Sequence, residues 1–490
     1  MILPALLALP AAGGALLRGS WDLWAQALLH TASAAGLSLW LSWRILVGYL
    51  PLPSRRSLLW TAALLALGAA SASMSALHAS ALPDWRTFLN ALWMFPAMAA
   101  LSKDERRGID QAVRAAALVL MTLAFYQRMV LRDPAPSSAL VNPNVYAGAV
   151  LMLLPLALET GDRLLALGLL ISLSWTQSVG AWLGLFSSML LSRSLRRTGW
   201  FWVGAAGALL CLGAIYDRLQ SPEFLHRWTW WGAALRMAWD KPLLGHGPGV
   251  FALLLPAYQQ REGLSTLYAH QYFLQTAAEY GLPFAALWFG GLWHCLRRGT
   301  SHKRFGARAV LIHSLWDWTL SMPSNLWLFS YFAASSIPEG SRGVNIPSRW
   351  RVPAAFAALC VGGWLMKGAL DPWAASRAER GAAQRLASGA VEDARRLCAE
   401  AVRLAPEDFQ AHLTSAEVEL EAARLASTPE TAARALSSSA ASLERAAELN
   451  PHRRPTWTLL SAVYTRMGLS DLSASARARA ARRFPAGEGP

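Results

Sequence analysis

The sequence predicts an all-α membrane protein, a polytopic transmembrane helix bundle of about 12–13 spans followed by a C-terminal α-helical repeat domain. Only 15% of the 490 residues are charged and 54% are hydrophobic, whereas about 25% of the residues of a typical globular protein are charged. Long apolar runs recur through residues 1–370, and the composition becomes polar and helix-forming from residue 371 onward. The same figures exclude a disordered chain and a small disulfide scaffold.

Each predicted span is an apolar run that is long enough, or nearly long enough, to cross a membrane. A spanning helix needs roughly 20 apolar residues because the hydrocarbon core is about 30 Å thick. Residues 1–17 lack the basic start of a signal peptide and are taken as a retained helix. Residues 164–192 fit either one long tilted helix or a tight hairpin. The predicted spans lie near residues 2–17, 22–48, 58–80, 84–101, 111–131, 144–160, 164–179, 180–192, 200–216, 282–296, 309–320, 325–337 and 353–368.

Basic residues in the short loops set the expected orientation of the bundle. Residues 371–490 carry 16 basic and 15 acidic residues, so nearly all of the net charge of +15 lies in the membrane domain. One set of alternate short loops holds 17 Lys and Arg residues, whereas the other holds three, Arg18, Arg86 and Arg132. Cytoplasmic loops carry the basic excess, which places segment 217–281 and the tail on the far side of the membrane. The charge therefore indicates topology and not nucleic-acid binding.

The tail, residues 371–490, is predicted to be a helical repeat domain. Two similar amphipathic helices end in Leu-x-Pro and place Pro406 45 residues before Pro451, and a partial third copy places Pro485 34 residues after Pro451. A spacing of 34 residues is the tetratricopeptide period, and the longer spacing predicts an insertion near residues 422–440. Such repeats offer a concave surface to a protein partner. The alternative is a plain helical cap at the membrane surface.

Segment 217–281 is the longest polar excursion in the membrane domain and the predicted location of the chemistry. It contains Arg218, Arg227 and Arg236, and the last two are nine residues apart, which puts them on opposite sides of a straight helix. Arginine grips a pyrophosphate bidentately. The alternative is that these arginines contact lipid head groups.

The same segment continues with a glycine-rich turn, Gly245-His246-Gly247-Pro248-Gly249, in which backbone amides can approach a ligand closely. His270 follows and opens a helix. A histidine with a pKa near neutrality can take a proton from an acceptor hydroxyl, although a single histidine is more often structural.

Polar residues within the apolar spans give a second candidate region. His313 and Asp317 are four residues apart and are expected to share one helix face. Ionisable groups at membrane depth are costly and tend to face the bundle interior, so the pair predicts either a polar pocket under the loop or a buried structural pair. No acidic cluster is present to hold a metal, and no cofactor is expected.

Five stretches, in this order, resemble motifs of the O-antigen ligase and polymerase family of bacterial envelope glycosyltransferases. The third and fourth together are rather specific. The stretches are Asn142-Pro143-Asn144 with the apolar helix after it, TQSVGAWLGL from Thr176, RWTWWGAALRMAWDKPLLGHGPGVF from Arg227, AHQYFLQTAAEYGLPF from Ala269 and HSLWDWTLSMP from His313.

This resemblance implies a GT-C-like membrane domain that moves a glycan from an undecaprenyl-diphosphate carrier, on the periplasmic face of a bacterial inner membrane. The acceptor in the family is lipid A-core, another glycan repeat or a protein. By resemblance, His270 is the catalytic residue that activates the acceptor and Arg227 engages the diphosphate. By the same resemblance, Arg218 and Arg236 are secondary candidates for binding the diphosphate, and Asp317 is a supporting polar group. Asn142 and Asn144 shape a helix break near the substrate site.

Two positions depart from the family pattern. Val179 stands where the family often has arginine, and Gln271 replaces the asparagine that follows the histidine. A diphosphate contact is therefore missing or comes from elsewhere. Ligase, polymerase and protein O-oligosaccharyltransferase activities all fit the sequence. A membrane-anchored repeat scaffold for envelope assembly is the alternative of another class.

Overall fold

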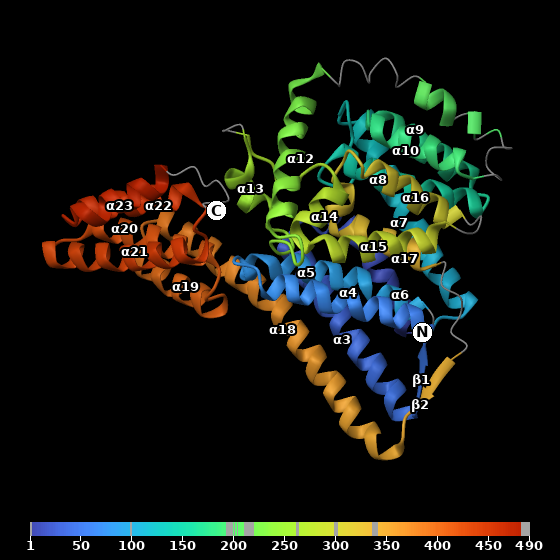
Figure 1. Ribbon diagram of the computed structural model, residues 1–490, viewed down its shortest axis with the longest axis horizontal. Coiled ribbons are helices and arrows are strands. Elements are labelled where there is room, and N and C mark those ends of the chain that lie inside the picture. Colours follow the sequence, from blue (N-terminus) through green and yellow to red (C-terminus); the bar gives the residue numbers. More distant parts are fainter. Residues whose placement is uncertain are drawn as a thin grey trace.

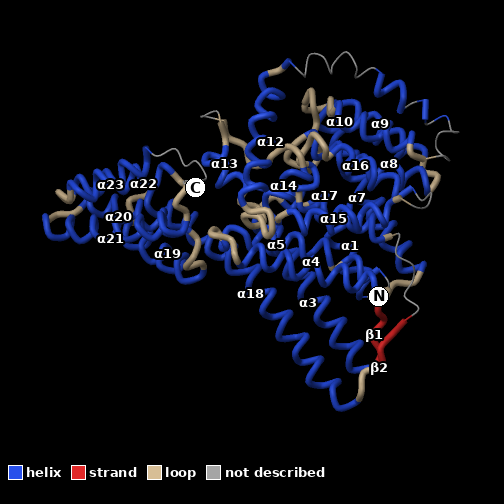
Figure 2. Tube along the Cα trace, in the orientation of Figure 1, coloured by secondary structure: helices blue, strands red, loops and turns tan. Residues whose placement is uncertain are grey.

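The protein consists of a helical bundle and a helical tail that are joined by one long helix (Figure 1). The computed structural model describes residues 2–98, 100–192, 199, 201–202, 204–209, 220–260, 264–297, 302–335 and 342–481. Within these ranges the chain is almost entirely helical, and its one sheet is a short antiparallel pair (Figure 2). In that pair β1 (Tyr49–Leu52) runs beside β2 (Arg342–Asn345). The all-α prediction is confirmed.

The bundle comprises the helices up to α17 and the first half of α18. They are α1 (Ile2–Ala8), α2 (Gly14–Leu16), α3 (Leu23–Val47), α4 (Arg55–Ser73), α5 (His78–Leu92), α6 (Met94–Met98), α7 (Lys103–Met129), α8 (Pro143–Glu159), α9 (Arg163–Trp175), α10 (Val179–Leu190), α12 (Pro222–Asp240), α13 (Phe251–Tyr258), α14 (Tyr272–Tyr280), α15 (Leu282–Leu296), α16 (His302–His313), α17 (Pro323–Ala334) and α18 (Ser348–Ala387).

Several predicted spans coincide with single helices, and others are interrupted. α3, α8 and α15 begin and end within a residue or two of the predicted runs. Residues 164–192 form the hairpin, as α9 and α10, with a break at Thr176–Ser178. By length and composition, two helices of the described ranges are able to cross a membrane, α7 and α18, and five apolar helices are shorter. Most of the 12–13 predicted crossings therefore do not correspond to one long helix.

The predicted helix over residues 309–320 is wrong, because α16 ends at His313. The carbonyl of Ser314 accepts a hydrogen bond from the Tyr272 backbone N–H, 3.0 Å away, and so stabilises a non-helical segment there. A 3-10 turn, Thr319–Ser321, follows before α17. His313 and Asp317 consequently do not share a helix face.

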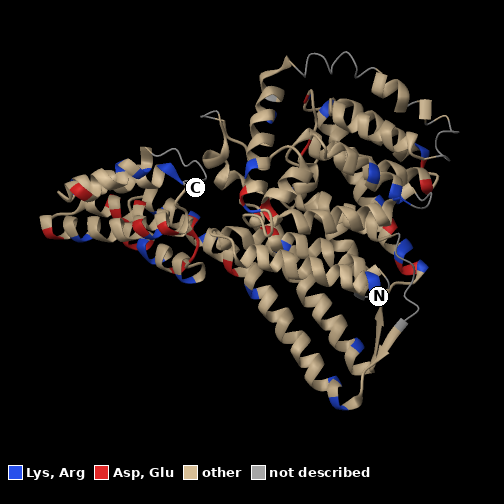
Figure 3. Cartoon of the chain, viewed as in Figure 1, with Lys and Arg blue, Asp and Glu red and all other residues tan. Residues whose placement is uncertain are grey.

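The core of the bundle is filled by large aromatic and aliphatic side chains, whereas its outer surface is also apolar. Trp288, Trp327 and Phe284 are completely buried, and Trp288 stacks on Trp60 with 5.8 Å between ring centroids. The outward faces of α3 and α18 expose large apolar side chains, such as Trp364 at 71%. Charged residues of both signs are dense along the tail and sparser in the bundle (Figure 3). A continuous apolar exterior fits contact with lipid.

The tail is an array of helices packed in chain order, each against the next. α18 runs through residue 371, the predicted boundary, without interruption and carries the tail away from the bundle (Figure 1). The Ala- and Ser-rich residues 422–440, the predicted insertion, lie at the end of one tail helix and in the first half of the next, which are linked at residues 426–428. Pro485 lies outside the described residues. The tail helices are α19 (Val391–Leu404), α20 (Phe409–Leu425), α21 (Pro429–Leu449), α22 (Arg454–Arg466) and α23 (Ser470–Ala481).

Candidate active site

Arg227 and His270 approach the same short segment, residues 316–318, from two different elements. Arg227 lies in the second turn of α12, which begins at a Ser221 cap. Its side chain is buried, and its Nη1 donates to the carbonyl of Trp316 at 2.6 Å. His270 lies just before α14, and its ring contacts Trp318 edge-on with 6.5 Å between centroids. The structure therefore brings the two predicted catalytic residues to one place.

Trp230 connects these two residues directly. It lies three residues after Arg227 on α12, is buried, and stacks on the His270 ring with 5.0 Å between centroids and 22° between planes. Stacking and the edge contact with Trp318 fix the imidazole between two indoles. Because aromatic pairs of this kind contribute about 0.5–1.5 kcal/mol, the ring has a defined orientation.

The backbone of His270 is itself in an unusual conformation. Its φ is 54°, in the left-handed region that only a few per cent of non-glycine residues adopt. Gln177, in the break between α9 and α10, has a φ of 55°. Such conformations cost on the order of 1–3 kcal/mol each and cluster at functional sites. The position of His270 is thus imposed by the surrounding fold.

Asp317 and the start of α8 complete this region. Asp317 is 2% exposed, and its Oδ1 accepts the backbone N–H of Trp318 at 2.8 Å. The side chain of Asn142 caps α8 by accepting the N–H of Asn144 at 2.8 Å. The buried ring of His313 faces the backbone of Asn144 and is within electrostatic range of Asp317 and Arg227. Asp317 therefore lies beside the Arg227 contact, and the backbone of Asn144 approaches this region at His313.

The other two predicted arginines are placed differently. Arg236 lies on the opposite side of α12, as its spacing predicts, and its guanidinium donates to the carbonyl of Tyr258 at the end of α13, with an Nε–O distance of 2.8 Å. It does not join Arg227 at residues 316–318. Arg218 lies outside the described residues.

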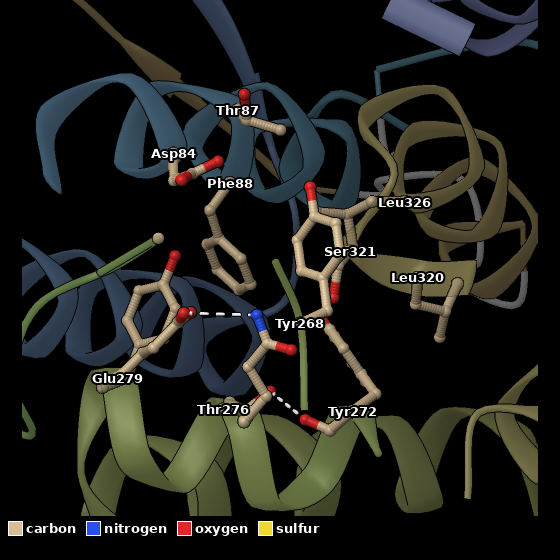
Figure 4. A pocket seen from close by; sticks show the side chains of 13 residues that line it. Asp84, Thr87, Phe88, Tyr268, Tyr272, Thr276, Glu279, Leu320, Ser321 and Leu326 are labelled. Carbon is tan, nitrogen blue, oxygen red and sulfur yellow. Dashed lines mark hydrogen bonds between the residues drawn. The ribbon is translucent and has the colours of Figure 1, made fainter. Parts of the chain in front are cut away.

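A pocket lies beside Tyr268, whose ring pairs with that of Trp318. The two rings stack with 4.6 Å between centroids and 10° between planes. Tyr268 also lines a cavity of about 50 Å³, together with Asp84 and Phe88 of α5 and several α14 side chains (Figure 4). Asp84 is exposed to this cavity and makes no hydrogen bond or ion pair within the described ranges. A carboxylate with free oxygens therefore lies beside the candidate site.

Glu279 organises the wall of this pocket. Its Oε1 accepts the backbone N–H of Phe251 at 3.3 Å and the Nε2 of Gln275 at 3.2 Å. The Oε1 of Gln275 in turn accepts the N–H of Ala269, the residue before His270, at 3.1 Å. Burial, reinforced by the Asp84 carboxylate, raises the pKa of Glu279 to about 8. Glu279 is therefore protonated at neutral pH and links the glycine-rich turn to the His270 loop.

The glycine-rich turn packs tightly against the same two acids. Gly249 has a φ of +67°, and a Cβ on it would lie 1.5 Å from Oδ2 of Asp84. The backbone N–H groups of His246 and Gly247 donate to the carbonyls of Ala278 and Glu279 at the end of α14. Only glycine fits at residue 249. The turn therefore fixes the position of the pocket wall, and it is not an open loop of the kind that binds phosphate.

The segment that contains these features matches a known family. Residues 164–289 match the family model described as O-Antigen ligase. The matched segment is about a quarter of the chain and is similar to an O-antigen ligase domain. Proteins of this family are membrane-embedded, glycan-transferring enzymes. The comparisons with curated proteins and with solved structures returned no match.

The matched segment contains Arg227, His270 and Glu279, whereas Asp84 and Asp317 lie outside it. Asp84, Gln275 and Glu279 are not among the site residues predicted from the sequence. An acidic residue in an apolar run is a signal for Asp84. For Gln275 and Glu279 of α14, the available signal is their spacing of four residues, which places them on one face of a helix.

The two departures from the family pattern both fall at helix starts. Gln271 caps α14 by accepting the N–H of Leu274 at 2.6 Å, so its amide performs a structural task. Val179 is the first residue of α10, next to Gly180, whose backbone packs against the ring of His313. In the described ranges no group of three His, Cys, Asp or Glu residues is arranged to hold a metal ion.

Proposed function

We propose that this membrane-embedded enzyme transfers a glycan from an undecaprenyl-diphosphate carrier to an acceptor hydroxyl on the periplasmic face of a bacterial inner membrane. The observation that supports it most is the convergence of Arg227 and His270 on residues 316–318, within and beside the matched segment. These residue types match the two needs of the reaction, an anion binder and a proton acceptor.

In the proposed reaction, the acceptor hydroxyl attacks the anomeric carbon of the donor sugar. The bond from that carbon to the diphosphate oxygen breaks, the hydroxyl proton passes to His270, and the carrier leaves as lipid diphosphate. Arg227 stabilises the negative charge that develops on the diphosphate. Asp317 lies next to the Trp316 carbonyl that Arg227 contacts, and its role is to support that segment.

The pocket at Asp84 suits the hydroxyl groups of a glycan substrate. A carboxylate with free oxygens accepts hydrogen bonds from sugar hydroxyls, which are strong because the acceptor is charged. Phe88 and Tyr268 contribute aromatic surface to the same pocket (Figure 4). The pocket therefore complements a neutral polyol, whereas the Arg227 side complements an anion.

The test is glycan transfer by purified variants in membranes. His270→Ala and Arg227→Ala should each abolish transfer at unchanged protein level. Arg236→Ala is the matched control on the same helix. Because Arg236 binds the Tyr258 carbonyl and not the 316–318 segment, this variant should lose less transfer activity than Arg227→Ala. Full transfer by both of the first two variants refutes the proposal.

The acceptor class is read from the glycans of a deletion strain. Loss of all long chains on lipid A-core identifies a ligase. Capping by a single repeat identifies a polymerase, and loss of glycans from proteins identifies a protein O-oligosaccharyltransferase. The scaffold alternative is favoured if the deletion strain has an unaltered glycan profile and removal of residues 371–490 abolishes envelope assembly.

A further inference from the structure

A second cavity, distinct from the Asp84 pocket, lies between α3, α5 and α18. It has a volume of about 70 Å³. The residues that matter for its chemistry are Ser33 and Leu37 of α3, Arg86, Asn90 and Trp93 on or just after α5, and Leu365 of α18. It opens on the face of α5 opposite to Asp84 and Phe88, and none of the residues proposed to act in transfer lines it.

Two buried polar groups in its wall have no hydrogen-bond partner within the described ranges. The Nδ2 of Asn90 is one, on a side chain that is 5% exposed, and the Oγ of Ser33 is the other, on a residue that is 2% exposed. The Oδ1 of Asn90 accepts the indole N–H of Trp93 at 3.1 Å. Because an indole nitrogen only donates, this contact fixes the amide orientation and leaves Nδ2 as the unused donor.

Arg86 adds a positive charge on the same face of α5, four residues before Asn90. Its guanidinium makes no hydrogen bond or ion pair in the described part of the chain, and it packs against the backbone of α18 at Gly368. Asp371, the acid within electrostatic range of Arg86 on that helix, is paired instead with Lys367. Buried polar groups are normally satisfied, so an unpaired cation beside two unsatisfied polar groups indicates an anionic ligand.

The remainder of the cavity is apolar and follows the helices away from Arg86. Leu37 lies one turn beyond Ser33 on α3, and Trp93 lies seven residues beyond Arg86, about 10 Å along a helix. Large apolar side chains are exposed elsewhere on α3 and α18, as at Leu39 and Trp364. The cavity is thus charged at one end and apolar at the other.

We propose that this cavity binds the phosphate head group of an anionic membrane phospholipid. The Arg86 guanidinium contacts the phosphate, the Asn90 amide and the Ser33 hydroxyl donate to its oxygens, and the acyl chain lies along Leu37, Trp93 and Leu365. Arginine pairs with phosphate oxygens through two parallel hydrogen bonds. The site is separate from Arg227 and His270, so it does not depend on the proposed reaction.

The test uses the full-length protein purified in a neutral detergent. The probes are dioctanoyl phosphatidylglycerol, dioctanoyl phosphatidylcholine and inorganic phosphate, with the bound lipid counted by native mass spectrometry and the Tm measured in parallel. We expect phosphatidylglycerol to bind and to raise the Tm. Phosphatidylcholine should bind at least tenfold more weakly, and inorganic phosphate should have no effect at the same concentration.

Variants locate the binding. Arg86→Gln should weaken phosphatidylglycerol binding at least tenfold, whereas Arg132→Gln, an exposed arginine in another loop of the same predicted side, should bind as the unaltered protein does. Ser33→Ala removes an unsatisfied hydroxyl, so its Tm without lipid should not fall, and its lipid binding should weaken. This variant separates loss of binding from misfolding.

Four outcomes overturn the proposal. Equal effects of inorganic phosphate and phosphatidylglycerol indicate a site for a free anion, and equal binding of the two lipids indicates that charge is not recognised. Equal weakening by Arg86→Gln and Arg132→Gln indicates diffuse surface attraction. Unchanged binding by Arg86→Gln indicates that Arg86 only extends to the membrane surface.

Discussion

Replacing Glu279 tests whether its hydrogen bonds, rather than its charge, organise the candidate active site. In Glu279→Ala, the Phe251 N–H and the Gln275 amide lose their acceptor inside the protein. Each buried donor left unpaired costs about 1–3 kcal/mol, so the free energy of unfolding should fall by about 2–6 kcal/mol. Glu279→Gln keeps an acceptor oxygen and resembles the protonated acid, and it should cost less than about 1 kcal/mol.

Burial also gives Glu279 a defined pH dependence. Its pKa rises from 4.5 in the unfolded chain to about 8 in the folded protein, so the folded state binds the proton more tightly. The stabilising contribution is complete below pH 4.5, decreases as the pH rises, and is lost above about pH 8. Glu279→Gln should remove this part of the pH dependence.

The assay is thermal unfolding in detergent between pH 5 and pH 9, with glycan transfer measured on the same preparations. We expect the alanine variant to unfold at a lower temperature and to lose transfer, because the Gln275 link to the residue before His270 is broken. The glutamine variant should retain both properties at pH 7. A glutamine variant as damaged as the alanine variant, or an alanine variant with unchanged stability, refutes the reasoning.

Three further predictions follow from the backbone and the buried histidines. His270→Ala and His270→Gly should both lose glycan transfer. The glycine variant should be the more stable by about 1–2 kcal/mol, because residue 270 has a positive φ. Equal melting temperatures of the two variants contradict backbone strain at residue 270. Gly249→Ala should lower both the Tm and glycan transfer because the new Cβ meets Asp84. Gly290→Ala on α15, with nothing within 4 Å of its Cβ, should be neutral or slightly stabilising. Equal behaviour of the two variants contradicts the close packing of residue 249 against Asp84. Burial and the nearby Lys241 lower the pKa of His246 from 6.5 to about 4. The contribution of neutral His246 to stability is therefore present above pH 6.5 and is lost as the pH falls toward 4. His246→Gln should remove this part of the fall in Tm at acidic pH, and an unchanged dependence of the Tm on pH excludes this role.

Local signals in the sequence predicted much of the helical framework. Asn142 is followed by proline, and it caps a helix that starts where the apolar run starts. The spacing of Arg227 and Arg236 on one helix predicted their opposite directions, which their separate carbonyl partners confirm. The length of an apolar run and the residue type at a helix cap are local properties of the sequence. Both are therefore predictable without knowledge of tertiary contacts.

The parts that the sequence did not predict depend on contacts between distant residues. α16 ends at His313 beside a hydrogen bond between Ser314 and Tyr272, so periodicity alone extends the helix too far. The pocket depends on Asp84 and Gly249, which are 165 positions apart and meet only in the folded chain. No local pattern encodes such a pair.

The arrangement of charge around the Tyr268–Trp318 stack connects the fold to the proposed reaction. Arg227 contacts the 316–318 segment, which also holds the Asp317 carboxylate, and His270 lies against Trp318. Asp84 lines a pocket that Tyr268 also lines, and burial raises the pKa of the second acid there, Glu279, to about 8. In the proposed transfer, Arg227 binds the anionic lipid diphosphate, whereas the Asp84 carboxylate accepts hydrogen bonds from the hydroxyl groups of a neutral glycan. In the proposed reaction, His270, which lies against Trp318, is the base that receives the proton released by the acceptor hydroxyl.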